Sequence, residues 1–155
     1  MEFITKSSQE TKDLGKKIGS NLAGLKKNRA VIFALSGELG SGKTTFVQGL
    51  ALGLGIETRI ISPTFILVRK YAGKDIDFYH LDLYRLEGNV EGQVRDLGID
   101  EFWSDPNNVV VIEWAEKIKD VVPESAVWMT FEGTDETRKI TLRVDTDETL
   151  HRYVK

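Results

Sequence analysis

The chain has 155 residues, a length most simply read as one domain, which can bury roughly 70% of the surface that its unfolded form would expose. It has no cysteine, no secretion-signal pattern at its start and no apolar run long enough to span a bilayer, so we expect a cytoplasmic protein without disulfides or thiolate metal sites. Its 21 basic and 24 acidic residues give a formal charge of -3, and without a basic excess direct nucleic-acid binding is disfavoured.

The amino-terminal part of the chain predicts a strand followed by a helix. Residues 3–5 predict a short strand, and Ser7 followed by Glu10 has the spacing of a capping box at a helix start. The apolar residues that would share one face of this helix are Leu14, Ile18, Leu22 and Leu25. We expect the charged run at residues 26–29 to close the helix in solvent.

A P-loop motif follows directly. Residues 37–44 read Gly-Glu-Leu-Gly-Ser-Gly-Lys-Thr, after an apolar run at residues 31–35 that predicts a buried strand and before a helix-like stretch at residues 46–54. Glycines in such a loop let backbone N–H groups turn toward a polyphosphate, and the following helix adds the positive end of its dipole. The residues expected to contact the nucleotide are Gly37, Glu38, Leu39, Gly40, Ser41, Gly42, Lys43, Thr44 and Thr45.

Two of these residues have specific chemistry. Lys43 would contact the β- and γ-phosphates, and the Thr44 hydroxyl would bind Mg²⁺. The alternative is a glycine-rich turn that merely resembles the motif. The strand before the loop and the helix after it favour nucleotide binding.

The rest of the chain predicts mostly strands. Gly53 and Gly55 indicate a turn, after which residues 60–71 are expected to be extended, because Pro63 and the β-branched and aromatic composition oppose a helix. Further strands are predicted at residues 76–81, 109–113, 127–131 and 140–144, with turns at residues 72–74, 105–108 and 133–135, and a loop passing into a short helix at residues 82–95. We therefore expect an α/β fold over residues 1–155, a P-loop NTPase-like three-layer domain around a central mixed, largely parallel sheet.

Two acids could complete a nucleotide site. Glu113 ends the apolar strand at residues 109–113, where P-loop enzymes place an acid that helps to hold Mg²⁺. Asp82 follows the strand at residues 76–81 and would lie beside the γ-phosphate, holding Mg²⁺ through water or orienting the attacking water. The alternatives are a solvated strand end for Glu113, a loop cap for Asp82 and a packed core ring for the neighbouring His80.

Two other segments have open interpretations. The turn at residues 62–65, Ser-Pro-Thr-Phe, could respond to the γ-phosphate as switch loops do, or be only a turn. Trp114 could lie near the nucleotide, serve a partner surface or fill the core. His151 has no evident role.

Five ordered segments together resemble one protein family. They are GELGSGKTT at residues 37–45, SPTF at 62–65, HLDLYRL at 80–86, LGIDEF at 97–102 and IEW at 112–114. Over about residues 7–143 the chain resembles the TsaE family, also called YjeE, the bacterial ATPases of tRNA threonylcarbamoyladenosine biosynthesis. The resemblance implies an ATPase that uses ATP and Mg²⁺ and works with the TsaB and TsaD proteins, which install the threonylcarbamoyl group on adenosine 37 of tRNAs reading codons that begin with A. The tRNA would be reached through those proteins.

The resemblance also implies roles for single residues. Lys43 and Thr44 would be the phosphate and Mg²⁺ residues, Glu113 the second metal-site acid and Asp82 a residue needed for hydrolysis, so the catalytic set is Lys43, Asp82 and Glu113. Trp114 would sit beside that site. At the edge of the site, Ser8 and Thr11 would approach the nucleotide and Arg138 would flank the adenine.

The chain departs from the family pattern at two places. The family commonly has Asp and Ala where this loop has Glu38 and Ser41, which are conservative changes at positions whose backbone contacts the phosphates. The stretch before residue 97 is often acidic in the family, whereas this chain carries Gln93 and Arg95. The second departure concerns partner contacts and leaves the ATP site intact.

Three other functions compete with this interpretation. A P-loop small-molecule kinase would need an arginine-bearing lid, whereas this chain has single, scattered arginines at Arg59, Arg69, Arg85, Arg95, Arg138 and Arg143. A GTPase is disfavoured because the chain has no NKxD segment. A nucleotide-dependent assembly switch that barely turns over remains compatible with the resemblance.

Overall fold

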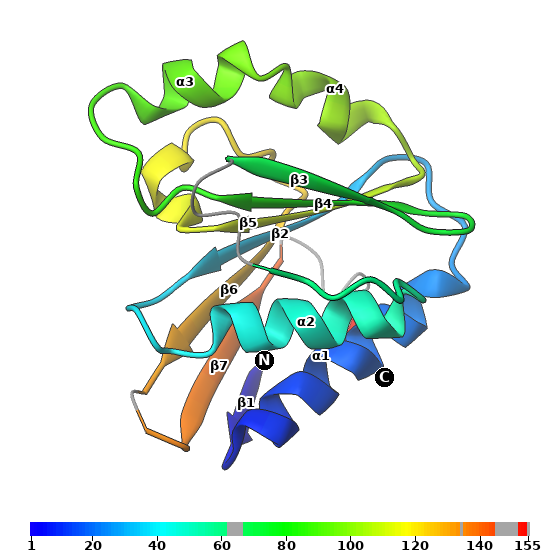
Figure 1. Ribbon diagram of the computed structural model, residues 1–155, viewed down its shortest axis with the longest axis vertical. Coiled ribbons are helices and arrows are strands. Elements are labelled where there is room, and N and C mark those ends of the chain that lie inside the picture. The colour runs from blue at the N-terminus through cyan, green and yellow to red at the C-terminus, as the bar shows by residue number, and fades with distance from the viewer. Residues whose placement is uncertain (62–66, 134, 145–151, 155) are drawn as a thin grey trace.

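The computed structural model describes residues 1–61, 67–133, 135–144 and 152–154 (Figure 1). Its strands are β1 (Glu2–Thr5), β2 (Val31–Ser36), β3 (Val68–Ala72), β4 (Asp77–Asp82), β5 (Asn108–Glu113), β6 (Val127–Glu132) and β7 (Arg138–Arg143). Its helices are α1 (Ser8–Ala23), α2 (Lys43–Gly53), α3 (Val90–Asp96) and α4 (Ile99–Ser104), with a 3₁₀ turn η1 (Ala115–Ile118).

All seven strands belong to one sheet, in the order β1-β7-β6-β2-β5-β4-β3. The four central strands, β6, β2, β5 and β4, are parallel to one another, whereas β1, β7 and β3 pair in antiparallel fashion at the two edges. The expected mixed, largely parallel sheet is therefore confirmed. Parallel central strands point their carboxyl ends to one edge, which is where ligands bind in α/β sheets.

Helices cover the two faces of the sheet and create two cores. Figure 1 shows α1 and α2 on one face and α3 and α4 on the other. The larger core lies beneath α1 and α2 and contains Phe33, Phe46 and Phe131, while the second lies beneath α3, α4 and η1 and contains Ile112 and Leu81. Every residue of β5 is buried, because this strand is covered on both faces, as is usual for parallel sheets.

Helices α1 and α2 pack backbone against backbone. A Cβ atom at Gly15 would overlap the carbonyl oxygen of Phe46, and one at Gly49 would overlap that of Lys12. Glycine at these positions permits a closer approach than any side chain would allow. Because α2 begins at the P-loop, this packing brings the start of α1 close to the same loop.

Two helix boundaries differ from the sequence prediction. Helix α1 ends at Ala23 with Gly24 as its C-cap, so Leu25 packs against the core from outside the helix. Helix α2 begins at Lys43, three residues earlier than expected, and its N-cap residue Gly42 has a left-handed backbone conformation that glycine adopts readily. Strand β3 begins at Val68 within the segment expected to be extended, and residues 62–66 of that segment lie outside the described residues.

The predicted capping box is present in a slightly shifted form. The Ser7 hydroxyl accepts a hydrogen bond from the Glu10 backbone N–H at 3.1 Å, and the Glu10 carboxylate accepts one from the Lys6 N–H at 2.6 Å. The charged run at residues 26–29 does not close this helix, because helix α1 has already ended. Within that run, the Lys27 Nζ is buried, and burial lowers the pKa of its ammonium.

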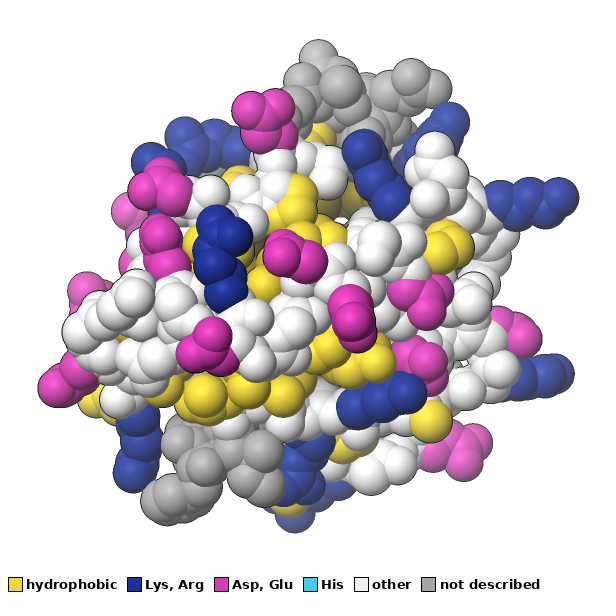
Figure 2. Space-filling model, turned by 90° about the horizontal axis from the view of Figure 1, so that it is seen from above, with side chains coloured by type: hydrophobic (Ala, Val, Ile, Leu, Met, Phe, Trp, Pro, Cys, Tyr) yellow, Lys and Arg dark blue, Asp and Glu magenta, His cyan; other side chains and the backbone are white. Residues whose placement is uncertain are grey.

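The face covered by α3 and α4 carries charges of both signs. Figure 2 shows acidic and basic side chains interspersed there, with hydrophobic side chains between them. Helix α3 exposes both Gln93 and Arg95, the residues that depart from the family pattern. No helix in the described part of the chain is long and apolar enough to cross a membrane.

Candidate functional site

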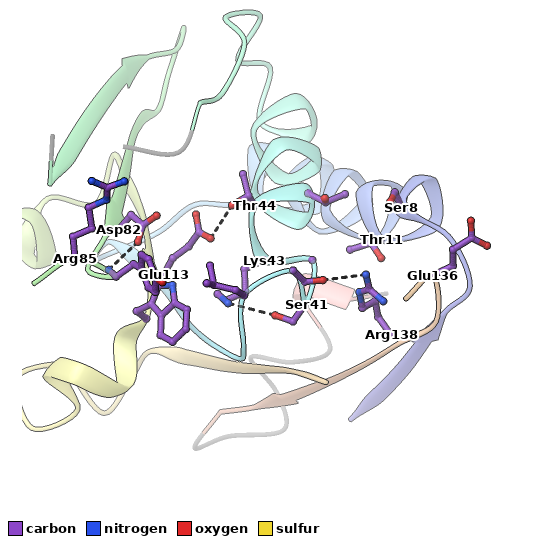
Figure 3. Close-up of a pocket in the computed structure, with 16 residues that line it drawn as sticks. Ser8, Thr11, Ser41, Lys43, Thr44, Asp82, Arg85, Glu113, Glu136 and Arg138 are labelled. Atoms are coloured by element: carbon purple, nitrogen blue, oxygen red, sulfur yellow. Dashed lines mark hydrogen bonds between the residues drawn. The ribbon is translucent and has the colours of Figure 1, made fainter. Parts of the chain in front are cut away.

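A cavity of about 410 Å³ lies at the carboxyl ends of β2, β4 and β5 (Figure 3). Its walls come from the start of α1, the P-loop, the segments that follow β4 and β5, and the start of β7. The residues that line it are Ser8, Thr11, Leu39, Gly40, Ser41, Gly42, Lys43, Thr44, Thr45, Asp82, Tyr84, Arg85, Glu113, Trp114, Glu136 and Arg138.

The P-loop conformation depends on its glycines. Gly37 has a φ of +143°, and a Cβ atom there would lie 2.5 Å from the carbonyl oxygen of Phe131 on the neighbouring strand β6. Gly42 has a φ of +100° and directly precedes α2. The chain can therefore leave β2, turn tightly and present the amino end of α2 to the cavity, which is the arrangement that favours phosphate.

Lys43 is held by the loop that contains it. Its ammonium donates hydrogen bonds to the backbone carbonyls of Gly37 at 2.5 Å and Glu38 at 2.9 Å, and it lies 4.5 Å from the ring centre of Trp114. Burial lowers the pKa of Lys43, and nearby carboxylates, Glu113 foremost, partly oppose that shift. A buried cation surrounded by acceptors and a π face is well suited to bind the oxygens of a phosphate.

Thr44 and Glu113 meet at the floor of the cavity. The Thr44 hydroxyl donates a hydrogen bond to Oε1 of Glu113 at 2.9 Å, and Glu113 is almost completely buried. Two oxygens on adjacent corners of the octahedron around Mg²⁺ lie about 2.8–3.0 Å apart, given ligand distances of about 2.0–2.1 Å. A hydroxyl and a carboxylate are hard oxygen ligands, so this pair has the chemistry and the spacing that would suit Mg²⁺.

Asp82 stands beside Glu113 on the neighbouring strand. The two residues are register partners at the ends of β4 and β5, and both line the cavity. Oδ1 of Asp82 also accepts a hydrogen bond from the Tyr84 backbone N–H at 3.0 Å. The Asp82 carboxylate therefore does both things that the sequence left open: it caps the turn and it lines the cavity.

The backbone turns at Trp114, directly after Glu113. Its φ of 62° makes it the one non-glycine residue with positive φ among those that the structure describes. Such a conformation is costly and is typical of functional sites. The indole lies between the cavity and the second core, with its ring centre 5.0 Å from that of Tyr84. Trp114 therefore both lines the cavity and packs against the core.

Residues far apart in the sequence form the other edge of the cavity. Ser8 and Thr11 come from the first turns of α1, and Arg138 starts β7. The Arg138 guanidinium donates a hydrogen bond to the Gly40 carbonyl at 3.0 Å, and the Thr11 hydroxyl is paired with that of Thr5 at 2.7 Å. Close packing of α1 on α2 and pairing of β7 with β6 bring these groups to the P-loop.

Most of the predicted site residues gather at this cavity, with two exceptions. Gly37 and Glu38 do not line it, and their carbonyls instead accept hydrogen bonds from Lys43. The predicted turn at residues 62–65 and His151 lie outside the described residues.

Sequence reasoning missed three lining residues. Tyr84, Arg85 and Glu136 were not predicted to belong to the site. Arg85 follows Asp82 closely and could have been found from that proximity, whereas Glu136 carried no signal. Two of the scattered arginines, Arg85 and Arg138, are thus brought to one cavity, at its opposite ends (Figure 3).

The parallel sheet, the P-loop and the acids at the ends of β4 and β5 define an α/β protein of the P-loop nucleotide-binding class. Within that class the chain belongs to the TsaE family, because the family model described as "Threonylcarbamoyl adenosine biosynthesis protein TsaE" matches residues 5–140.

Individual relatives agree with this assignment. The chain is 36% identical to the tRNA threonylcarbamoyladenosine biosynthesis protein TsaE of Haemophilus influenzae, over 86% of this chain and 82% of that protein. It is 37% identical to the protein of the same name from Treponema pallidum, over 92% of this chain and 99% of that protein. The crystal structure of YdiB from Bacillus subtilis superimposes with a TM-score of 0.75 at 29% identity, covering 98% of this chain and 90% of that one.

Proposed function

We propose that this chain is a Mg²⁺-dependent ATPase that acts with TsaB and TsaD to form the threonylcarbamoyl group on adenosine 37 of tRNAs reading codons that begin with A. The observation that carries the ATPase proposal is the contact of Thr44 with Glu113 at 2.9 Å beneath the P-loop. The pathway is supported by the family and by the names of the relatives, which are tRNA threonylcarbamoyladenosine biosynthesis proteins.

Binding of ATP would use the P-loop and its lysine. The backbone N–H groups from Gly40 to Thr45 at the start of α2 would surround the polyphosphate, and Lys43 would exchange its carbonyl partners for phosphate oxygens. Thr44 and Glu113 would hold Mg²⁺, which when bound neutralises charge that develops on the phosphates. At the opposite edge, Ser8, Thr11 and Arg138 would contact the rest of the nucleotide.

Hydrolysis would transfer the γ-phosphoryl group to water. The water oxygen forms a bond to the γ-phosphorus while the bond from that phosphorus to the β–γ bridging oxygen breaks, giving ADP and phosphate, and the proton that the water loses passes to the phosphate oxygens or to solvent. We assign to Asp82 the role of orienting this water and accepting its hydrogen bond, a role supported by its position in the cavity wall beside Glu113. Loss of the group that orients the water would slow hydrolysis without weakening ATP binding. We therefore assign Asp82 to the hydrolysis step and Glu113 to metal binding.

Partners would complete the site. Of the arginines that the structure describes, Arg85 and Arg138 line the cavity at its opposite ends and so form no cluster, and the Arg138 guanidinium donates to the Gly40 carbonyl. An additional cation at the γ-phosphate is worth about 10³-fold or more in rate for P-loop enzymes, so we expect slow turnover without partners. With no basic excess to hold RNA, tRNA would be reached through TsaB and TsaD in the bacterial cytoplasm.

The experiment that tests the metal site is replacement of its acid. Glu113→Gln should raise the Mg²⁺ concentration needed for half-maximal ATPase activity by about tenfold or more, because a neutral amide is a poorer ligand for a hard cation. Glu132→Gln is the matched control, since Glu132 also ends a parallel strand but is exposed and does not line the cavity. An unchanged Mg²⁺ requirement in Glu113→Gln would remove this acid from the metal site.

A further inference from the structure

A histidine buried behind the metal site contacts its carboxylate. His80 lies on β4 with no exposed surface, and its Nε2 is 2.5 Å from Oε2 of Glu113. In the register of the parallel strands, His80 faces Val111, two residues before Glu113, so both side chains project from the same face of the sheet. This is the face covered by α1 and α2, where Phe78 and Val111 belong to the apolar core.

The surroundings of the ring indicate which nitrogen carries the proton. Nδ1 of His80 is buried and has no hydrogen-bond partner among the described residues. A proton on Nδ1 would therefore leave a buried donor unpaired and would turn the Nε2 lone pair toward an oxygen of Glu113, which is itself an acceptor. The favoured tautomer carries its proton on Nε2, and that N–H donates to Glu113.

Both oxygens of Glu113 are consequently held. Oε2 accepts from the His80 ring, and Oε1 accepts from the Thr44 hydroxyl at 2.9 Å. A carboxylate that is hydrogen-bonded at one oxygen cannot rotate freely, so its other oxygen stays directed at Thr44. Hydrogen-bonding groups behind a ligand commonly orient it in this way and change metal affinity 10- to 100-fold when they are removed.

We propose that His80 is a positioning residue for Mg²⁺: it fixes Glu113 so that Oε1 and the Thr44 hydroxyl form a ready pair of metal ligands. This inference rests on the proposed Mg²⁺ site. A purely structural role would be served better by an apolar residue, because burying an imidazole with one nitrogen unpaired costs free energy that a leucine or phenylalanine would not cost. The presence of a polar ring at an otherwise apolar position marks a functional requirement.

The test measures nucleotide binding and needs no turnover. A fluorescent ATP analogue is titrated into the full chain in EDTA and then at increasing Mg²⁺, for the unaltered protein, His80→Leu and His80→Gln. Leucine fills similar volume without a donor, whereas the glutamine amide can place an N–H near the position of Nε2. Circular dichroism and the melting temperature establish that each variant is folded.

We expect affinity in EDTA to change less than about threefold in both variants, since Lys43 and the loop are untouched. The Mg²⁺ concentration that gives half of the affinity gain should rise about tenfold or more in His80→Leu and much less in His80→Gln. If His80→Leu does not fold, His80→Asn takes its place, because its amide is too short to reach Glu113.

Each outcome has a definite meaning. If His80→Leu folds and its Mg²⁺ requirement is unchanged, the inference about His80 is overturned and the proposed metal site is not. If the Mg²⁺ requirement of His80→Gln rises as far as that of His80→Leu, the inference is also overturned, since the hydrogen bond would then be irrelevant. An unaltered protein that gains no affinity from Mg²⁺ would instead overturn the proposed metal site itself.

Discussion

Replacement of Gly49 by alanine tests whether the close contact of α1 with α2 is needed for this fold. Gly49 lies in the middle of α2, and a Cβ atom there would overlap the carbonyl oxygen of Lys12, with the carbonyl carbon and Cα of Lys12 close behind. All three are backbone atoms of α1, so no side-chain rotation can relieve the overlap. The helices must move apart or the substituted helix must shift.

Two effects of opposite sign set the size of the change. Alanine is favoured over glycine in a helix interior by about 1 kcal/mol. Forcing an extra carbon into a closely packed contact costs typically about 1–3 kcal/mol, and the upper end applies at Gly49 because the obstacle is backbone. We therefore expect Gly49→Ala to lower the free energy of unfolding by about 2 kcal/mol, which for a chain of this size lowers the melting temperature by about 4–8 °C.

Thermal unfolding followed by circular dichroism measures this shift. Gly24→Ala is the matched control, because Gly24 has an ordinary φ of -98° and a Cβ there would meet nothing within 4 Å. The control should stay within about 0.5 kcal/mol of the unaltered protein. A Gly49→Ala variant that melts at or above the unaltered protein would refute the reasoning, since helix propensity would then outweigh the contact.

The remaining predictions concern the roles of single site residues. Lys43→Ala should weaken binding of a fluorescent ATP analogue with or without Mg²⁺, because in the proposed site its ammonium would bind phosphate directly. Thr44→Ala should weaken binding mainly when Mg²⁺ is present, because its hydroxyl would act through the metal. Unchanged affinity in both variants would end the P-loop interpretation. Asp82→Asn should retain ATP while turnover falls about 10²-fold or more, and a loss of nucleotide binding measured in the same titration would reassign Asp82 to the binding site.

Local signals in the sequence were sufficient for the centre of the site. The P-loop was predictable because its glycines, Lys43 and Thr44 are contiguous and flanked by an apolar run and a helix. Glu113 was predictable because it ends an apolar run, and a buried parallel strand places such a residue at the ligand edge of the sheet. The mixed sheet followed from the alternation of strand and helix signals, although the strand order did not.

Features that depend on distant parts of the chain were not predictable. Whether His80 is a plain core ring depends on which residue of β5 it faces, and register is a property of the folded sheet. That Arg85 and Arg138 line opposite ends of one cavity depends on the folded sheet, because Arg85 follows β4 and Arg138 begins β7. The glycines of α1 and α2 permit close packing of the two helices, and this role can be seen only once the helices are placed against each other.

The most direct test of the central claim is an ATPase assay that follows released phosphate for the chain alone, with TsaB and TsaD, and with tRNA alone. The account predicts slow release by the chain alone, an increase of at least about tenfold with the two proteins together, and no increase with tRNA alone. Rapid hydrolysis that is indifferent to both proteins, or stimulation by tRNA without them, would contradict it.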